Sequence, residues 1–211
     1  MPANLLIIGA GGFGRELYAA SLECRGYGID FVPGGFLDAR AGALDGFSGY
    51  PPVLGSPETY APRENDVFAV ALGSVEARRR CAQTLSAKGA RFIALVHGRA
   101  NVGFNVEIGP GSYIAPGVSL TADVRIGAHV DVFHNTSVGH DTVIGDFAHV
   151  YAQCAIGGGV KVGKGARIFP GSTLVPRIKI GDGATVGAGS AVFLDVRDGE
   201  TVMGNPAAPI E

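Results

Sequence analysis

The 211-residue chain contains no tryptophan, two methionines and three cysteines. The cysteines, Cys24, Cys81 and Cys154, are odd in number and widely separated, with no C-x-x-C pair. This pattern favours neither a disulfide framework nor a zinc site with cysteine ligands. A chain of this length buries enough apolar surface to fold without covalent crosslinks. We therefore expect the three thiols to be buried as small apolar groups.

Charged residues and long apolar runs are also scarce. Asp, Glu, Lys and Arg make up 17% of the chain and the formal net charge is -2, whereas roughly 25% charged residues is usual. No cluster of Lys or Arg provides the basic surface that binds nucleic acid. No apolar run approaches the ~18 residues that a membrane-spanning helix needs. We expect a cytoplasmic protein that binds neither nucleic acid nor a membrane.

Glycine, in contrast, is abundant. It accounts for 34 of the 211 residues, about twice the usual share of roughly 7%. A disordered glycine-rich chain has little apolar content, yet 46% of these residues are hydrophobic. The composition excludes disorder and indicates a folded chain whose backbone turns often.

The C-terminal half repeats in units of six, or hexads. A period of six fits neither an α-helix nor a plain alternating strand, but it fits a short strand followed by a corner. Three hexads make one coil. Phe133, Tyr151 and Phe169 are each separated by three hexads, so we expect them to stack as a ladder. The pattern predicts a parallel β-helix, and the period leaves its handedness open. The aliphatic positions of the repeat are Val96, Val102, Ile108, Ile114, Leu120, Ile126, Val132, Val138, Ile144, Val150, Ile156, Val162, Ile168, Leu174, Ile180, Val186 and Val192.

Two other positions of the repeat are constrained. The fourth residue after each aliphatic one is mostly small or β-branched, and Cys154 occupies such an inward position. The residue directly after the aliphatic one is often glycine, as at Gly139 and Gly157. A glycine there serves either a positive φ angle or a close approach of two backbone segments.

The N-terminal half is typical of a small Rossmann-like α/β domain, which we expect over residues 1–95. The apolar run 5–8, the glycine turn 9–14 and the segment 15–20 predict a strand, a tight turn and a helix. Free amides at the helix start favour a phosphate, although a tight turn without a ligand explains the glycines equally well. Further strands are expected within 29–38, 67–74 and 91–95, and a helix within 75–88.

The size of this half restricts its ligand. About 95 residues are too few for a full dinucleotide fold, which disfavours NAD chemistry, but half of such a fold is enough for a mononucleotide or a nucleotide sugar. Asp38 follows the second expected strand, where a carboxylate can reach a ribose or a base.

Four of the five histidines, His129, His134, His140 and His149, fall close together in the repeat. With three hexads per coil, His140 stacks between Ala122 and Gly158, which are small and leave room for a substrate beside the imidazole. Asp141 can orient that ring only if a corner brings the two side chains together.

The other histidines have simpler interpretations. His134 stacks between Pro116 and Ala152 and is a second candidate. His149 stacks between Asp131 and Arg167, an arrangement that fits a surface ion network. Solvent-exposed histidines without a function are the alternative for each of them.

Residues 96–197 resemble the hexapeptide-repeat acyltransferases through their [LIV]-G-x4 signature. The run from Asn135 to His149, NTSVGHDTVIGDFAH, resembles the bacterial nucleotide-sugar acetyltransferases grouped with sialic acid O-acetyltransferases. That group includes UDP-4-amino-sugar and GDP-perosamine N-acetyltransferases, which also begin with a small α/β domain bearing a glycine turn. The resemblance implies a left-handed parallel β-helix over 96–211, ending in a C-terminal tail, and an acetyl-CoA-dependent enzyme.

The resemblance also implies roles for individual residues. His140 corresponds to the catalytic base, and Asp141 to the acidic neighbour that raises its basicity, here with a shorter side chain than the Glu of the best-known member. Phe13 and Ala39 replace polar residues of relatives, so the hydrogen bonds made there must be absent or replaced. The acetyl-CoA contacts correspond to His149, Gly158, Pro170 and Ala188, and the sugar-nucleotide contacts to Gly11, Gly12, Phe13, Asp38, Ala39 and Gly73.

The chemistry and the resemblance together predict N-acetylation of a nucleotide-linked 4-amino-4-deoxy sugar. One positioned base can take the proton that the attacking amine loses. No Ser or Cys elbow is present, so we expect direct transfer without an acyl-enzyme. The resemblance implies a homotrimer with acetyl-CoA between subunits, and we expect no metal.

Two other interpretations stay open. The same base can activate a hydroxyl, as in O-acetylation of sialic acid. A prism of this kind can also be a non-catalytic scaffold, or a metal-dependent hydratase whose zinc ligands, His134 and His140 among them, meet across a subunit interface. The sequence does not reveal the nucleotide, the sugar or the pathway.

Overall fold

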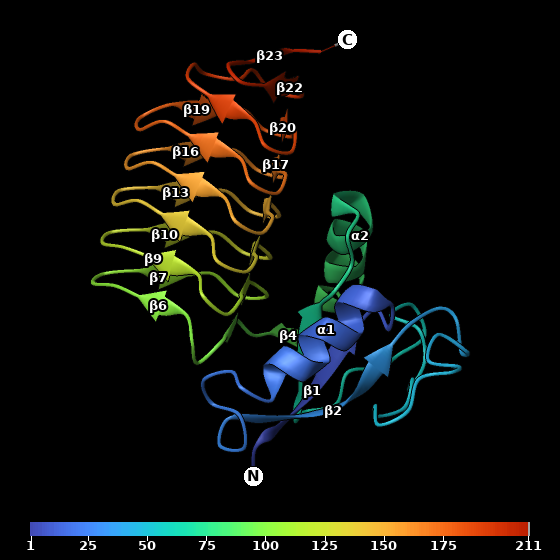
Figure 1. The fold of residues 1–211 in the computed structure, drawn as a ribbon. Coiled ribbons are helices and arrows are strands. Elements are labelled where there is room, and N and C mark those ends of the chain that lie inside the picture. Colours follow the sequence, from blue (N-terminus) through green and yellow to red (C-terminus); the bar gives the residue numbers. More distant parts are fainter. Residues whose placement is uncertain (211) are drawn as a thin grey trace. The chain divides into compact units, whose positions relative to one another are not determined.

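The computed structural model describes residues 1–210, which form two compact units, Met1–Gly98 and the residues from Arg99 onward (Figure 1). The expected fold class is confirmed: a small parallel α/β domain precedes a left-handed parallel β-helix. Among the described residues, no helix is long and apolar enough to cross a membrane.

The first unit contains a four-stranded parallel sheet in the order β2-β1-β3-β4. After β1 the chain adds β2 on one side of it, and later crosses over to add β3 and β4 on the other side. The strand order therefore reverses between β1 and β3. Open α/β sheets bind ligands at the carboxyl ends of the strands at such a point. Leu6, Ile8, Phe68 and Leu85 belong to the apolar core. Its elements are β1 (Ala3–Ile8), α1 (Gly12–Ser21), β2 (Phe31–Leu37), β3 (Asp66–Val70), α2 (Val75–Ser86) and β4 (Arg91–Phe92).

The glycine turn after β1 is built from positions with different requirements. Gly9 has φ +98°, a left-handed conformation that favours glycine. A Cβ on Gly14 would overlap the Gly9 carbonyl oxygen, so the close packing of α1 on β1 requires the bare backbone there. Gly11 is the N-cap and Gly12 the first residue of α1, which therefore begins before the expected start near Arg15.

Replacing Gly14 with alanine is expected to lower the free energy of unfolding by about 1–3 kcal/mol, because the added methyl group overpacks the turn. The matched control is Gly12→Ala in the same helix turn. A Cβ there meets no atom within 4 Å, so its stability should be unchanged or slightly higher. Urea unfolding of both variants measures the difference, and equal stabilities would contradict the packing argument.

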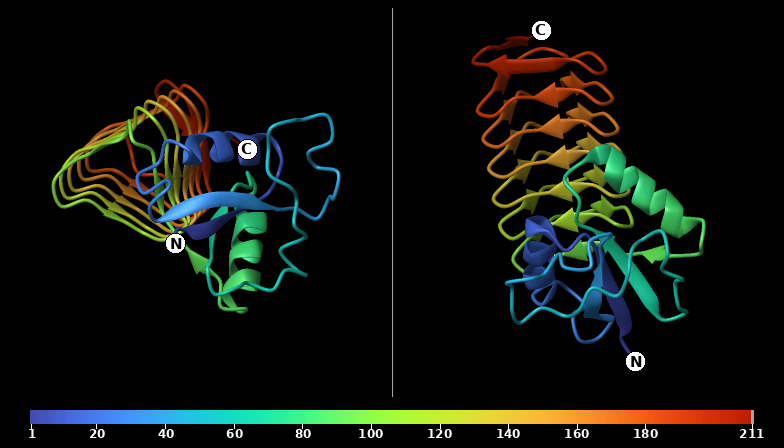
Figure 2. Two further views of the ribbon diagram at one scale, coloured as in Figure 1. Left: turned by 90° about the horizontal axis from the view of Figure 1, so that it is seen from below. Right: turned by 90° about the vertical axis from the view of Figure 1, so that its right-hand side faces the viewer.

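The second unit consists of two-residue strands that recur with every hexad and turn at corners between them. Each aliphatic position from Val102 to Val192 is the second residue of such a strand, as expected. Strands three hexads apart pair with each other, as Ser137 does with Ala155, so each coil stacks directly on the next. The coils superimpose in the left view of Figure 2.

The strands of the repeat follow one another at intervals of six residues. A short antiparallel hairpin of β22 and β23 comes after them. Two sheets run β19-β16-β13-β10-β7 and β21-β18-β15-β12-β9-β6, and the third includes β22-β20-β17-β14-β11-β8. The bounds are β5 (Leu95–Val96), β6 (Asn101–Val102), β7 (Glu107–Ile108), β8 (Tyr113–Ile114), β9 (Ser119–Leu120), β10 (Arg125–Ile126), β11 (Asp131–Val132), β12 (Ser137–Val138), β13 (Val143–Ile144), β14 (His149–Val150), β15 (Ala155–Ile156), β16 (Lys161–Val162), β17 (Arg167–Ile168), β18 (Thr173–Leu174), β19 (Lys179–Ile180), β20 (Thr185–Val186), β21 (Ala191–Val192), β22 (Thr201–Gly204) and β23 (Ala207–Pro209).

The corners show which of the two glycine requirements applies. The positive φ angle falls on the third residue after the aliphatic one, as at Asp141 (φ 61°) and Gly159 (φ 70°). The glycine directly after the aliphatic residue serves close approach instead: a Cβ on Gly139 would lie 2.5 Å from the backbone nitrogen of Gly158. The stacked coils therefore leave no room for a side chain at Gly139.

The predicted aromatic ladder and buried thiols are present. The ring centroids of Phe133 and Tyr151 lie 5.9 Å apart, and those of Tyr151 and Phe169 lie 4.8 Å apart, with both pairs stacked. All three cysteines are free and buried. Burial raises the pKa of the Cys154 thiol, which disfavours the thiolate that an acyl-enzyme would need.

Candidate functional site

The corner between β12 and β13 brings His140 and Asp141 together. Strand neighbours point to opposite faces, but Asp141 adopts φ 61°, which turns its carboxylate back toward the imidazole. The Nδ1 atom of His140 lies 2.7 Å from Oδ2 of Asp141. The side chains are 69% and 65% exposed, so the pair is open to solvent.

Stacking of the coils gives His140 the neighbours that were expected. The Gly159 N–H donates to the His140 carbonyl oxygen at 2.7 Å, and the Asp141 N–H donates to that of Ala122 at 3.1 Å. A Cβ on Gly158 would lie 2.7 Å from Nε2 of His140. Because Gly158 has no side chain, the imidazole of His140 can lie directly against the backbone of this glycine.

The proposed acetyl-CoA residues of the β-helix lie on two different edges. Gly158 shares the edge of His140. Pro170 and Ala188 are exposed and lie on the neighbouring edge, on the corners that stack above His134. The backbone hydrogen bond from Gly189 N–H to the Pro170 carbonyl, at 2.9 Å, joins adjacent coils there.

His149 does not form the surface network that its neighbours suggested. Its side chain is 3% exposed and that of Asp131 is fully buried, with 3.5 Å between Nδ1 and Oδ2. The imidazole packs against the rings of Phe133 and Tyr151, with centroids 4.9 and 4.5 Å away. Its strand position explains the error, because the side chain of this β14 residue is covered by the aromatic ladder. Its contact with acetyl-CoA stays a prediction.

Residues 1–210 contain no group of three or more His, Cys, Asp or Glu side chains arranged to hold a metal ion.

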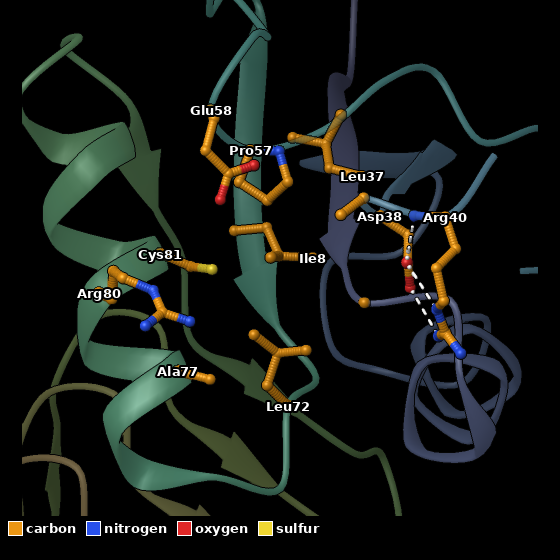
Figure 3. Close-up of a pocket in the computed structure, with 12 residues that line it drawn as sticks. Ile8, Leu37, Asp38, Arg40, Pro57, Glu58, Leu72, Ala77, Arg80 and Cys81 are labelled. Atoms are coloured by element: carbon orange, nitrogen blue, oxygen red, sulfur yellow. Dashed lines mark hydrogen bonds and ion pairs between the residues drawn. The ribbon is translucent and has the colours of Figure 1, made fainter.

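A cavity of about 270 Å³ lies in the first unit, at the carboxyl ends of its strands and against α2 (Figure 3). Of the predicted substrate residues, Asp38 and Ala39 line it, and Gly73 follows Leu72, which lines it as well. Gly11 lies near its rim, since a Cβ there would be 3.9 Å from Nη2 of Arg40, another lining residue. Gly12 and Phe13 form the first turn of α1.

Four hydrogen bonds within the chain occupy the Asp38 carboxylate. Oδ2 accepts the Ala10 N–H at 2.9 Å and Nη2 of Arg40 at 3.1 Å, while Oδ1 accepts the backbone N–H and Nε of Arg40 at 2.9 and 3.1 Å. Burial alone would raise the pKa of Asp38, but these bonds outweigh it and hold the pKa below its ordinary value. Asp38 therefore fixes the glycine turn and the Arg40 guanidinium.

Sequence reasoning missed three charged side chains that line this cavity: Arg40, Glu58 and Arg80. Arg40 is 70% exposed and held by Asp38. Glu58 comes from the irregular segment after β2 and Arg80 from α2, so no motif or fixed spacing links them. Only the pairing of β1 with its neighbours brings these segments to one edge of the sheet.

Known proteins match both units. Residues 4–85 match the PglD N-terminal domain, and residues 159–193 match the bacterial transferase hexapeptide (six repeats). The acetyltransferase domain of PglB from Neisseria gonorrhoeae, in complex with acetyl coenzyme A, is 28% identical, with a TM-score of 0.86 and coverage of 100% of both chains. The chain belongs to the PglD-like family of hexapeptide-repeat sugar N-acetyltransferases. The expectation of an acetyl-CoA-dependent acyltransferase is thereby confirmed.

Two other solved structures are similar to this PglD-like chain over nearly its full length. PerB from Caulobacter crescentus, in complex with CoA and GDP-perosamine, is 27% identical with a TM-score of 0.86, and the match covers 99% of this chain and 97% of PerB. WeeI from Acinetobacter baumannii is 28% identical with a TM-score of 0.72, covering 98% and 99%. No match was found among curated protein sequences.

Proposed function

We propose that this chain transfers the acetyl group of acetyl-CoA to the amino group of a nucleotide-linked 4-amino-4-deoxy sugar, with His140 as general base. The observation that carries the proposal is the exposed His140–Asp141 pair beside Gly158. It supplies an oriented imidazole that is open to solvent, on a fold whose solved relatives bind acetyl-CoA or CoA.

The pair is suited to proton transfer. When Nδ1 of His140 is protonated and donates a hydrogen bond to Asp141, Nε2 is left with a free lone pair. The substrate amine forms its bond to the thioester carbon while Nε2 takes the proton that the nitrogen loses. The carbon–sulfur bond then breaks, and the imidazolium can return the proton to the departing CoA sulfur. Nothing in this sequence requires an acyl-enzyme.

The placement of the proposed acetyl-CoA residues supports assembly as a homotrimer. Gly158 lies on the edge of His140, whereas Pro170 and Ala188 lie on the next edge of the same prism. One acetyl-CoA between two prisms can contact the His140 edge of one subunit and the Pro170 edge of its partner. His149 would assist only if the neighbouring rings shift. Holding both substrates there contributes through proximity.

The nucleotide is assigned to the cavity of the first unit. It opens at the sheet edge where the strand order reverses, the location at which such sheets bind nucleotides. Gly11 and Gly12 leave the start of α1 unobstructed for a phosphate. The guanidinium of Arg40, rather than the carboxylate of Asp38, is the charged group that would contact the ligand. Ala39 and Gly73 contribute backbone and space.

The test measures free CoA released from acetyl-CoA by the wild-type protein. The panel contains UDP-, dTDP- and GDP-linked 4-amino-4-deoxy sugars together with sialic acid and CMP-sialic acid. We expect release with at least one amino sugar. Release with the sialic acids alone would move the assignment to O-acetylation, and no release from any of them would overturn an acetyltransferase acting on these sugars.

A further inference from the structure

We propose that the cavity of the first unit selects a guanine base, so that the substrate is a GDP-linked amino sugar. This inference rests on the proposed function and specifies the nucleotide that the site accepts.

The cavity has two chemically different ends (Figure 3). Asp38 and Arg40 lie at one end, next to the glycine turn. Glu58 and Arg80 lie at the other, with Cys81 between them. The surfaces between the two ends are apolar, formed by the side chains of Ile8, Leu37, Pro57 and Leu72. A flat base between apolar walls, with charged groups at its edge, is the kind of ligand that such a cavity accommodates.

Glu58 and Arg80 both line the end of the cavity that contains Cys81. The Cys81 thiol is buried, and burial raises its pKa; the Glu58 carboxylate adds to that rise and the Arg80 guanidinium opposes it. All three residues line the same end of the cavity, with Cys81 between the other two in Figure 3. No ion pair joins Glu58 to Arg80 within residues 1–210, where the Glu58 backbone carbonyl, and not its carboxylate, accepts a hydrogen bond from Lys88.

Guanine matches this pair of charges better than the other bases. Its N1–H and N2 amino group form an adjacent pair of donors, which a carboxylate accepts together. Its O6 and N7 form an adjacent pair of acceptors, to which an arginine donates in the commonest specific guanine contact. Uracil and thymine have one N–H donor between two carbonyl acceptors, so they offer no donor pair to Glu58. Adenine has no donor at N1.

The opposite end suits the diphosphate. Asp38 holds Nε and Nη2 of Arg40, which leaves Nη1 and the outer side of the guanidinium for a phosphate oxygen. A nucleoside diphosphate with its base at Glu58 and Arg80 would extend toward Arg40 and the glycine turn. Asp38 is then a positioning residue for Arg40.

The inference is tested by isothermal titration calorimetry with GDP, IDP and UDP, using the full chain without acetyl-CoA. IDP lacks the 2-amino group and otherwise keeps the edge of guanine. We expect GDP to bind the wild type at least tenfold more tightly than UDP, and roughly three- to tenfold more tightly than IDP. Glu58→Gln should weaken GDP binding by roughly 10- to 100-fold and remove the preference for GDP over IDP. Glu64→Gln, an exposed acid outside the cavity, is the matched control and should bind like the wild type.

Three outcomes would overturn the inference. UDP could bind as tightly as GDP, Glu58→Gln could retain the wild-type affinity and GDP preference, or no nucleoside diphosphate could bind. The acetyl-transfer assay separates these from the proposed function: CoA release with a UDP- or dTDP-linked amino sugar alone would reject guanine selection and keep the enzyme class.

Discussion

His140→Ala is expected to lower kcat by roughly 10²- to 10⁴-fold, because the attacking amine loses the base that takes its proton. The His140–Asp141 hydrogen bond of 2.7 Å orients the ring for this step. Acetyl-CoA affinity should change little, since the imidazole transfers protons during the reaction and is not among the residues proposed to hold the cofactor. Steady-state kinetics and direct acetyl-CoA titration measure the two quantities separately.

His140→Asn is the control for shape. Asparagine keeps a polar planar group at the corner but provides no base, so it should be as slow as alanine. A His140→Ala enzyme that retained more than a tenth of the wild-type kcat at neutral pH would contradict the assignment of the base. So would full activity of the asparagine variant.

Gly158→Ala is expected to lower kcat by roughly 10- to 100-fold, although Gly158 itself carries no charged or reacting group. Its Cβ would lie 2.7 Å from Nε2 and 2.9 Å from Cε1 of His140, closer than carbon and nitrogen can approach. The exposed ring is the part that can move, so the base is displaced from the amine. Misplacement by about 1 Å can cost about 10²-fold in rate. Gly158 does not have a positive φ angle, so alanine introduces no backbone strain.

A double-mutant cycle isolates this effect from any change in folding. In the His140→Ala background the added methyl group has no ring to displace, and Gly158→Ala should then have almost no further effect on kcat. Two losses that multiply would show that Gly158 acts independently of His140, for example through acetyl-CoA. Urea unfolding of the single variant completes the comparison.

The strands of the β-helix could be predicted residue by residue, whereas the cavity of the first unit could not. Each hexad pairs with the third hexad after it, so the period determines strands, register and stacking neighbours together; Ala122, His140 and Gly158 align for this reason. The contact between His140 and Asp141 depends on the φ angle of one corner residue, which the pattern leaves open. The burial of His149 depends on the rings that cover it.

In the first unit, the sequence identified the glycine turn and Asp38 because both are local features. It did not show that Arg40, so close to Asp38 along the chain, donates three of the four hydrogen bonds that the Asp38 carboxylate accepts. Glu58 and Arg80 come from segments that are distant along the chain and carry no motif. They come to line the same cavity only after the strands pair, so their combination is a property of the tertiary structure.

The central claim is direct transfer of acetyl from CoA to a sugar nitrogen, and the structure of the product tests it most directly. The wild-type protein would be incubated with carbon-13-labelled acetyl-CoA and a GDP-linked 4-amino-4-deoxy sugar carrying nitrogen-15, and the product examined by NMR. The account predicts an acetyl carbonyl carbon coupled to the sugar nitrogen, formed in step with CoA release. An ester on a sugar oxygen, or no acetylated product with this or any other nucleotide-linked amino sugar, would contradict it.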